Sequence, residues 1–229
     1  MKKRIYILDG EPLARRGIQS LLEQETSFEL LGVSGSVRSA NHEIVRLRPD
    51  LLICDMVLPD GSALDLIRSL VARMAGLRIL VCSPNDEMIF AERAIKAGAH
   101  GYVMKSDPEE VFIKRVHQVL EGGLGLNDKL ASRMLRRLSG ASRYELPVSG
   151  ASLTMERLSG REMEVFEMLG RGLASKEVGD LLGISPRTVD THRARIREKL
   201  GYASSSDLMR AAFTWNESGR LTTAERTGW

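Results

Sequence analysis

The chain has 229 residues, of which 43% are hydrophobic, and this length is enough to bury one core of ordinary size and a second, smaller one. The net charge of +3 is too small to indicate a nucleic-acid partner by itself, and the 2 cysteines, Cys54 and Cys82, are expected to be buried thiols. No run approaches the ~18 apolar residues of a membrane span, and no signal peptide is recognisable, so we expect a cytoplasmic protein without a membrane partner.

Residues 1–122 alternate short β-branched runs with longer segments of helical period. The predicted strands are Arg4–Asp9, Phe28–Ser34, Asp50–Asp55, Arg78–Ser83 and Gly101–Lys105. The helices between them are expected near Leu13–Gln24, Ala40–Leu47, Ala63–Met74, Met88–Ala97 and Glu109–Glu121. This alternation predicts a five-stranded, doubly wound parallel sheet in an α/β domain.

Residues 123–153 are predicted to form a linker that contains one amphipathic helix. That helix, Asp128–Leu138, has the apolar residues Leu130, Met134 and Leu135 at helical spacing. The following residues, Ser139–Met155, are rich in Ser, Gly and Ala, which is typical of a linker. Lys and Arg outnumber Asp and Glu by 5 to 2 in residues 123–153, so the positive excess of the chain lies here.

Residues 154–215 predict a small all-α domain made of short helices. Ser159 and Glu162 form a capping-box pair, and Gly172 stands where the first helix is expected to end. The further helices are expected at Lys176–Leu182, from Pro186 to Leu200 behind the N-cap Ser185, and near Asp207–Trp215. The polar tail, residues 216–229, is expected to be disordered.

Polar residues end four of the five predicted strands: Asp9, Asp55, Ser83 and Lys105. A single Asp or Ser at a strand end is more often a turn residue than a functional one. In an open parallel sheet, however, the carboxyl ends of the strands form the edge at which ligands bind. Four such residues in one domain therefore favour a shared polar site.

The segments that carry these residues resemble the receiver domains of response regulators. The matching segments are ILDGEPLARRG at 7–17, LLICDMVLPDGSALDLI at 51–67, ILVCS at 79–83 and AGAHGYVMKS at 97–106. The resemblance implies that Asp55 is the phosphoacceptor, that Ser83 and Lys105 contact the phosphoryl group and that Tyr102 is an aromatic switch residue. It also implies Mg²⁺ as a cofactor and a sensor histidine kinase as a partner.

One position departs from the receiver pattern, which has two adjacent acidic residues at the end of the first strand. Here Asp9 is followed by Gly10, and Glu11 comes one place later. The loss of a direct ligand should lower the affinity for Mg²⁺ by at least ~10–100-fold, so we expect Mg²⁺ binding to be weak or absent. Three alternatives stay open. Glu11 joins Asp9 and Asp55 as a metal ligand, or the domain binds metal poorly and is phosphorylated slowly, or it works without phosphate.

Residues 157–201 resemble the LuxR/NarL type of helix-turn-helix through LSGRE, Gly172, KEV, SPRTV and KLG. Helical spacing directs Val189, Ile196 and Leu200 toward the core, with His192 packed beside them. The candidate DNA contacts are Lys176, Arg187, Thr188, Asp190, Thr191, Arg193, Ala194, Arg195 and Arg197. Of these, Asp190, Thr191 and Ala194 are expected at base edges in the major groove, and the others at phosphates.

One residue and one helix of this domain each have two possible interpretations. Asp190 either accepts from cytosine N4 or is simply favoured by the helix dipole. The last helix, Asp207–Trp215, either pairs two copies of the domain or packs on its own core.

The two resemblances together predict a response-regulator transcription factor of the NarL/FixJ family, with a receiver domain followed by a helix-turn-helix domain. Its expected partner is double-stranded promoter DNA, bound as a homodimer. The alternative is a pseudo-receiver transcription factor controlled by a ligand, a partner or abundance. An enzyme is not predicted, because aspartyl-phosphate phosphatases commonly carry a second acidic residue where Val57 stands.

Overall fold

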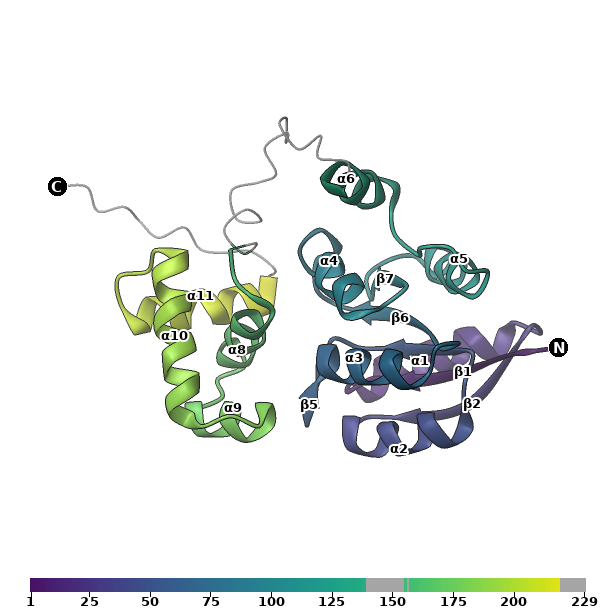
Figure 1. The fold of residues 1–229 in the computed structure, drawn as a ribbon, viewed down its shortest axis with the longest axis horizontal. Coiled ribbons are helices and arrows are strands. Elements are labelled where there is room, and N and C mark those ends of the chain that lie inside the picture. The colour runs from purple at the N-terminus through teal and green to yellow at the C-terminus, as the bar shows by residue number, and fades with distance from the viewer. Residues whose placement is uncertain (139–154, 156, 219–229) are drawn as a thin grey trace. The chain divides into compact units, whose positions relative to one another are not determined.

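The computed structural model describes residues 1–138, 155 and 157–218 of the chain (Figure 1). The chain divides into two compact units, Met1–Ser142 and Arg143–Trp229. None of the described helices combines the length and the apolar character that crossing a membrane requires.

The first unit contains a parallel sheet of five strands in the order β2-β1-β3-β6-β7. The strands are β1 (Lys3–Leu8), β2 (Phe28–Ser34), β3 (Leu51–Cys54), β6 (Arg78–Ser83) and β7 (Gly101–Met104). All five predicted strands are confirmed, but β1, β3 and β7 end one residue before the predicted Asp9, Asp55 and Lys105. The backbone of Asp55 still donates to Leu8 at 2.8 Å, so the chain leaves the sheet gradually at this edge.

Helices cover both faces of this sheet, as the alternating pattern predicts (Figure 1). They are α1 (Pro12–Gln24), α2 (Val37–Leu47), α3 (Ala63–Arg73), α4 (Glu87–Ala97) and α5 (Glu109–Leu120). The α1 and α5 face is filled by a continuous apolar core that includes Ile7, Ile53, Leu80, Val103 and Val116. Burial of such side chains is the main force that holds the layers together.

A short hairpin that the sequence analysis did not predict lies between β3 and α3. Its two strands are β4 (Val57–Leu58) and β5 (Gly61–Ser62). The carboxylate of Asp60 in its turn accepts hydrogen bonds from the backbone of Val37 at 2.7 Å and Arg38 at 3.0 Å. Asp60 therefore satisfies the first amides of α2 and fixes the loop that follows Asp55.

Helix α6 (Asp128–Leu138) has the predicted bounds and packs on α4 within the first unit. The segment that leads into it forms a parallel bridge between Gly125 and Gly101 of β7. Leu130 is fully buried, whereas Leu135 is exposed. The rest of the predicted linker, residues 139–153, lies outside the described residues.

The second unit consists of α8 (Gly160–Gly170), α9 (Ser175–Leu182), α10 (Pro186–Leu200) and α11 (Ser205–Ser218). The capping box is confirmed, because Ser159 and Glu162 exchange hydrogen bonds at the start of α8. Gly179 makes the tight turn between α9 and α10 possible, since a Cβ there would lie 2.7 Å from the carbonyl oxygen of Ile184. Helix α11 continues to Ser218, beyond the expected end at Trp215, and the predicted tail after it lies outside the described residues.

Candidate functional site

The carboxyl edge of the sheet brings the predicted polar residues together. The register pairs Leu8 of β1 with Cys54 of β3, so Asp9 and Asp55 leave neighbouring strands side by side. Each is only 1% exposed. The chain runs from β1 to β2 on one side and to β3 on the other, and ligands in open α/β sheets bind where the strand order diverges in this way.

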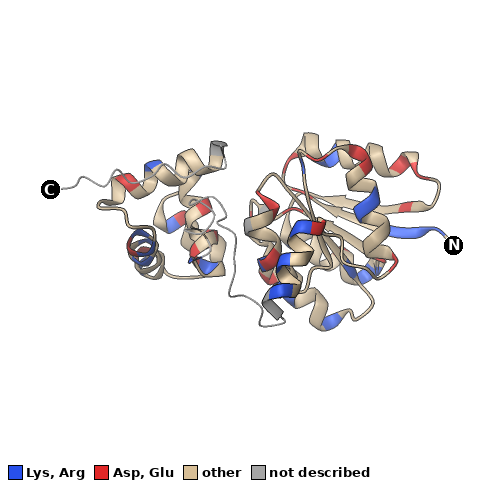
Figure 2. Cartoon of the chain, turned by 90° about the horizontal axis from the view of Figure 1, so that it is seen from above, with Lys and Arg blue, Asp and Glu red and all other residues tan. Residues whose placement is uncertain are grey.

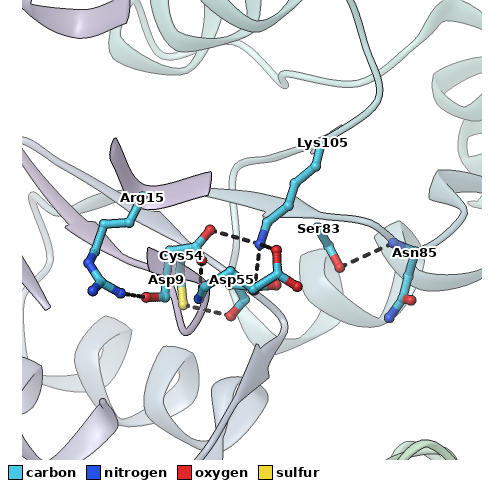
Figure 3. A network of polar contacts seen from close by, with 8 residues as sticks. Asp9, Arg15, Cys54, Asp55, Ser83, Asn85 and Lys105 are labelled. Carbon is cyan, nitrogen blue, oxygen red and sulfur yellow. Dashed lines mark hydrogen bonds and ion pairs between the residues drawn. The ribbon is translucent and has the colours of Figure 1, made fainter. Parts of the chain in front are cut away.

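The ammonium group of Lys105 lies at the centre of this edge (Figure 3). Its nitrogen is 2.9 Å from Asp9 Oδ2, 2.9 Å from Asp55 Oδ2 and 3.1 Å from Glu11 Oε2. Burial by itself would lower the pKa of Lys105, but the charges and hydrogen bonds of Asp55 and Asp9 outweigh burial and raise it. Lys105 is therefore a fixed positive charge among three carboxylates.

Glu11 reaches this cluster even though Gly10 separates it from Asp9. The backbone N–H of Glu11 donates to Asp9 Oδ1 at 2.7 Å, which turns the chain back toward the edge of the sheet. Arg15, one turn into α1, donates to the backbone carbonyl of Asp9 and was not a candidate from the sequence. The carboxylate of Glu11 thus lies in the cluster, although its side chain is 61% exposed.

The ligand atoms and the net charge of this cluster suit a hard divalent cation. Three carboxylates against one ammonium leave an excess of two negative charges, and oxygen is the ligand that Mg²⁺ prefers. In the described part of the chain, however, no three His, Cys, Asp or Glu side chains are arranged around a common metal position. Asp9, Glu11 and Asp55 converge on the Lys105 ammonium, and they are the residues that would hold Mg²⁺.

Ser83 and Tyr102 are linked to each other through Asn85. The hydroxyl oxygen of Ser83 accepts from the backbone of Asn85 at 3.4 Å, and the Tyr102 hydroxyl donates to the Asn85 carbonyl at 3.0 Å. Tyr102 is fully buried. Asn85 could not be recognised from the sequence, because its backbone and not its side chain makes these contacts.

The two cysteines are buried, unpaired thiols, as expected from their apolar surroundings. Cys54 donates to the carbonyl of Asp55 at 3.2 Å (Figure 3). Burial raises the pKa of both thiols, that of Cys82 to about 12, so neither is a reactive thiolate near neutral pH.

Helix α10 presents the predicted DNA-contacting residues outside the core of the second unit. Arg187, Thr188, Asp190, Thr191, Ala194 and Arg195 are exposed, as is Lys176 on α9, whereas Arg193 and Arg197 are half-buried. Val189, Ile196 and Leu200 are buried, which confirms the predicted orientation of the helix. Basic residues predominate on α10, which Figure 2 views nearly end on.

A polar network that the sequence analysis missed joins α9 to α10. The hydroxyl of Ser175 donates to Asp190 Oδ1 at 2.7 Å and accepts from Arg193 Nη1 at 2.9 Å. Arg193 and Asp190 also form an ion pair at 3.5 Å. Asp190 therefore has direct side-chain partners that neither interpretation of it included.

Two further residues of α10, Thr191 and His192, make contacts within the second unit. Thr191 donates its hydroxyl proton to the Arg187 carbonyl at 3.0 Å, which leaves its methyl group and an oxygen lone pair on the surface. His192 is half-buried, and burial lowers its pKa despite the charge of Glu162. It is a packed residue, as expected.

Two family models cover most of the chain. Residues 5–117 match the response regulator receiver domain, and residues 156–212 match the bacterial regulatory proteins of the luxR family. The DNA-binding transcriptional activator DevR/DosR of Mycobacterium tuberculosis is 31% identical over 200 residues, which is 86% of this chain and 88% of that protein. The transcriptional regulatory protein UhpA of Escherichia coli K12 is 32% identical over 209 residues, or 91% of this chain and 97% of UhpA.

Solved structures agree on the fold. The RcsB response regulator of Salmonella typhimurium has a TM-score of 0.74 at 21% identity, covering 96% of this chain and all of the RcsB chain. RcsB from the same organism, bound to promoter rprA with the phosphomimetic BeF₃⁻, has a TM-score of 0.69 at 21% identity, covering 92% of this chain and 98% of RcsB.

The fold and the two matched domains define a DNA-binding regulator with a receiver domain, and not an enzyme. The chain belongs to the NarL/FixJ family of response regulators, and it is a response-regulator transcription factor. The predicted family, fold class and function are thus confirmed.

Proposed function

We propose that phosphorylation of Asp55 controls the binding of promoter DNA by α10. The observation that carries this proposal is the position of the Lys105 ammonium, 2.9 Å from the buried Asp55 carboxylate. A fixed cation at this point offsets the charge of an incoming phosphoryl group, which is the main requirement of phosphoryl transfer.

The donor is a sensor histidine kinase or a small acyl phosphate. An oxygen of Asp55 forms a bond to phosphorus while the bond between phosphorus and the donor breaks, and the electron pair of that bond leaves with the donor. The hydroxyl of Ser83 then turns to hydrogen-bond the phosphoryl oxygens. Its contact with Asn85 couples this rotation to Tyr102.

Asp9, Asp55 and Glu11 would hold Mg²⁺ at the same site, and we expect this binding to be weak. Gly10 offers no carboxylate, and Glu11 is an exposed side chain that must give up its contact with Lys105 to bind metal. Mg²⁺ supplies positive charge for the phosphoryl oxygens when it is bound. Weak metal binding predicts slow phosphorylation at low Mg²⁺.

For the DNA-binding unit, we propose that α10 enters the major groove of promoter DNA and that a homodimer binds two half-sites. We also propose that the protein acts in the cytoplasm. Arg187, Arg193, Arg195, Arg197 and Lys176, with Thr188, contact phosphates, and Thr191, Ala194 and Asp190 face the bases. Support comes from the exposed basic surface of this helix and from its buried apolar face.

The decisive experiment is to incubate the full chain with acetyl phosphate at a series of Mg²⁺ concentrations. Mass spectrometry of the intact protein then measures how many phosphoryl groups it has gained. We expect the wild type to gain one phosphoryl group and Asp55→Asn to gain none. Asp65→Asn is the matched control, because Asp65 is an exposed carboxylate on α3, and it should behave as the wild type does. If the wild type gains no phosphoryl group at any Mg²⁺ concentration yet binds promoter DNA, regulation without phosphate is correct instead.

A further inference from the structure

A buried glutamate stands at the start of α4, outside the carboxylate cluster. Glu87 is the first residue of this helix and is 6% exposed. Its carboxylate accepts from the backbone N–H of Asn127 at 3.0 Å and from the Asn127 side-chain amide at 2.5 Å. A buried carboxylate is costly without partners, and the two hydrogen bonds from Asn127 offset part of that cost.

Asn127 holds α6 as well as Glu87. Its side-chain oxygen accepts from Leu130 at 2.7 Å, and its backbone carbonyl accepts from Ala131 at 2.9 Å, so it caps the first turn of α6. A second contact follows one turn later, where Arg133 Nη2 donates to the Met88 carbonyl at 2.6 Å. Helix α6 is thus attached to the first turn of α4 at two points.

The segment before Asn127 is attached to the switch strand β7. The carbonyl of Gly125 accepts from the backbone N–H of Tyr102 at 2.8 Å, and the Gly125 N–H donates to His100 at 3.0 Å. The hydroxyl of the same tyrosine contacts Asn85, two residues before Glu87. The segment therefore contacts the strand that carries Tyr102 directly, and through Asn127 it contacts Glu87, the first residue of α4.

We infer that the pair of Glu87 and Asn127 is the joint that holds α6 on the receiver, and that phosphorylation of Asp55 opens it. This inference rests on the proposed function. A rotation of Ser83 toward a phosphoryl group shifts Asn85, and that shift moves Glu87 two residues further on. Hydrogen bonds are short and directional, so a small displacement breaks the pair.

Release of α6 has a direct consequence for the output. Helix α6 precedes the DNA-binding unit in the chain, so its release would lengthen the segment before that unit that is not held by the receiver. In this mechanism Glu87 and Asn127 are positioning residues, and they touch neither the phosphoryl group nor DNA.

Amide hydrogen exchange of α6 in the full chain tests the joint directly, since it reports local opening. Asn127→Ala should accelerate exchange in residues 131–138 by about tenfold or more, because the side-chain hydrogen bond to Glu87 and the cap on Leu130 are both lost. Asn127→Asp keeps the oxygen that caps Leu130 but sets a carboxylate against Glu87, so it should accelerate exchange equally. The matched control is Asn41→Ala, which removes a hydrogen bond to Arg73 elsewhere on the unit.

A second comparison adds the phosphodonor. Phosphorylated wild type should show faster exchange in α6, Asn127→Ala should show no further increase, and Asp55→Asn should not respond. If Asn127→Asp exchanges as slowly as the wild type, the joint does not hold α6 and the inference is wrong. It is also wrong if α6 of fully phosphorylated wild type exchanges at the unphosphorylated rate. If the wild type takes up no phosphoryl group, the proposed function is wrong. The two Asn127 variants still test whether the pair of Glu87 and Asn127 holds α6 on the receiver.

Discussion

At the scale of single residues, the molecule differs from its family at Gly10, and the structure indicates how the difference is accommodated. The turn formed when Asp9 accepts from the Glu11 amide places a carboxylate in the cluster one residue later than the family pattern. That carboxylate is exposed, however, whereas Asp9 and Asp55 are buried. An exposed, flexible ligand loses more side-chain entropy on binding than a fixed one, so it contributes less to metal affinity.

The first prediction follows from this difference. Gly10→Asp should lower the Mg²⁺ concentration needed for half-maximal phosphorylation by about 10–100-fold, because it restores a carboxylate beside Asp9. Glu11→Gln should raise that concentration in the wild type. Phosphorylation by acetyl phosphate over a Mg²⁺ series measures both. If the wild type is fully phosphorylated at low millimolar Mg²⁺ and Gly10→Asp changes nothing, Glu11 already supplies a full ligand.

The second prediction separates phosphate from base contacts on α10. Arg197→Ala should weaken binding to every duplex and reduce the slope of log affinity against log salt by about 1, because one phosphate contact is lost. Thr191→Ala should leave that slope unchanged. It should reduce the free-energy difference between the preferred base pair and the others at one position by about 1–3 kcal/mol. Fluorescence anisotropy with a duplex selected from a random pool and with a scrambled duplex measures both quantities. Equal losses on the two duplexes for Thr191→Ala would remove it from the base-contacting set.

At the scale of elements, the sequence predicted the strands and helices well because their apolar periods and caps are local signals. The predicted strand ends at Asp9, Asp55 and Lys105 lie one residue beyond the observed ends, since an apolar run does not show where the backbone leaves the sheet. Contacts between distant residues could not be predicted in the same way. The pairing of Glu87 with Asn127, and that of Ser175 with Asp190, depend on how packed helices bring residues together, and no local pattern encodes this.

The third prediction concerns the attachment of α8 to α10. Glu162 is 3% exposed and accepts from the Ser159 amide at 2.7 Å and from Lys199 at 2.6 Å. Burial alone would raise the pKa of Glu162, but the hydrogen bonds from Lys199 and Ser159 lower it. A carboxyl whose pKa is lowered by folding adds stability above its unfolded pKa and loses it as the pH falls through the folded value.

Glu162→Gln should therefore destabilise the second unit by on the order of 1 kcal/mol at pH 7, and the difference from the wild type should shrink as the pH falls below ~4. Urea unfolding, followed by the fluorescence of the buried Trp215 in a Trp229→Phe background, measures this. A difference that stays constant between pH 7 and pH 3 would mean that the charge of Glu162 contributes nothing.

At the scale of the whole molecule, each of the two units has a core of its own. In the first unit, apolar strand residues pack against α1 and α5, and in the second Phe166, Val189, Ile196 and Trp215 are all buried. A unit that buries its own apolar residues and caps its own helices can fold without its neighbour. We therefore expect the DNA-binding unit to fold without the receiver.

The last prediction is that residues 154–229 alone fold and bind double-stranded DNA, with an affinity that falls as salt rises. Because this fragment lacks Asp55, acetyl phosphate should not change its affinity, whereas it should change that of the full chain. Circular dichroism establishes that the fragment is helical, and anisotropy titrations at several salt concentrations establish binding. Arg193→Ala in the fragment should weaken binding to every duplex and reduce the dependence of affinity on salt, since it removes the cation that Ser175 and Asp190 hold on α10. A helical fragment without salt-dependent affinity for any duplex at moderate ionic strength would contradict the assignment of α10 as the DNA-binding helix.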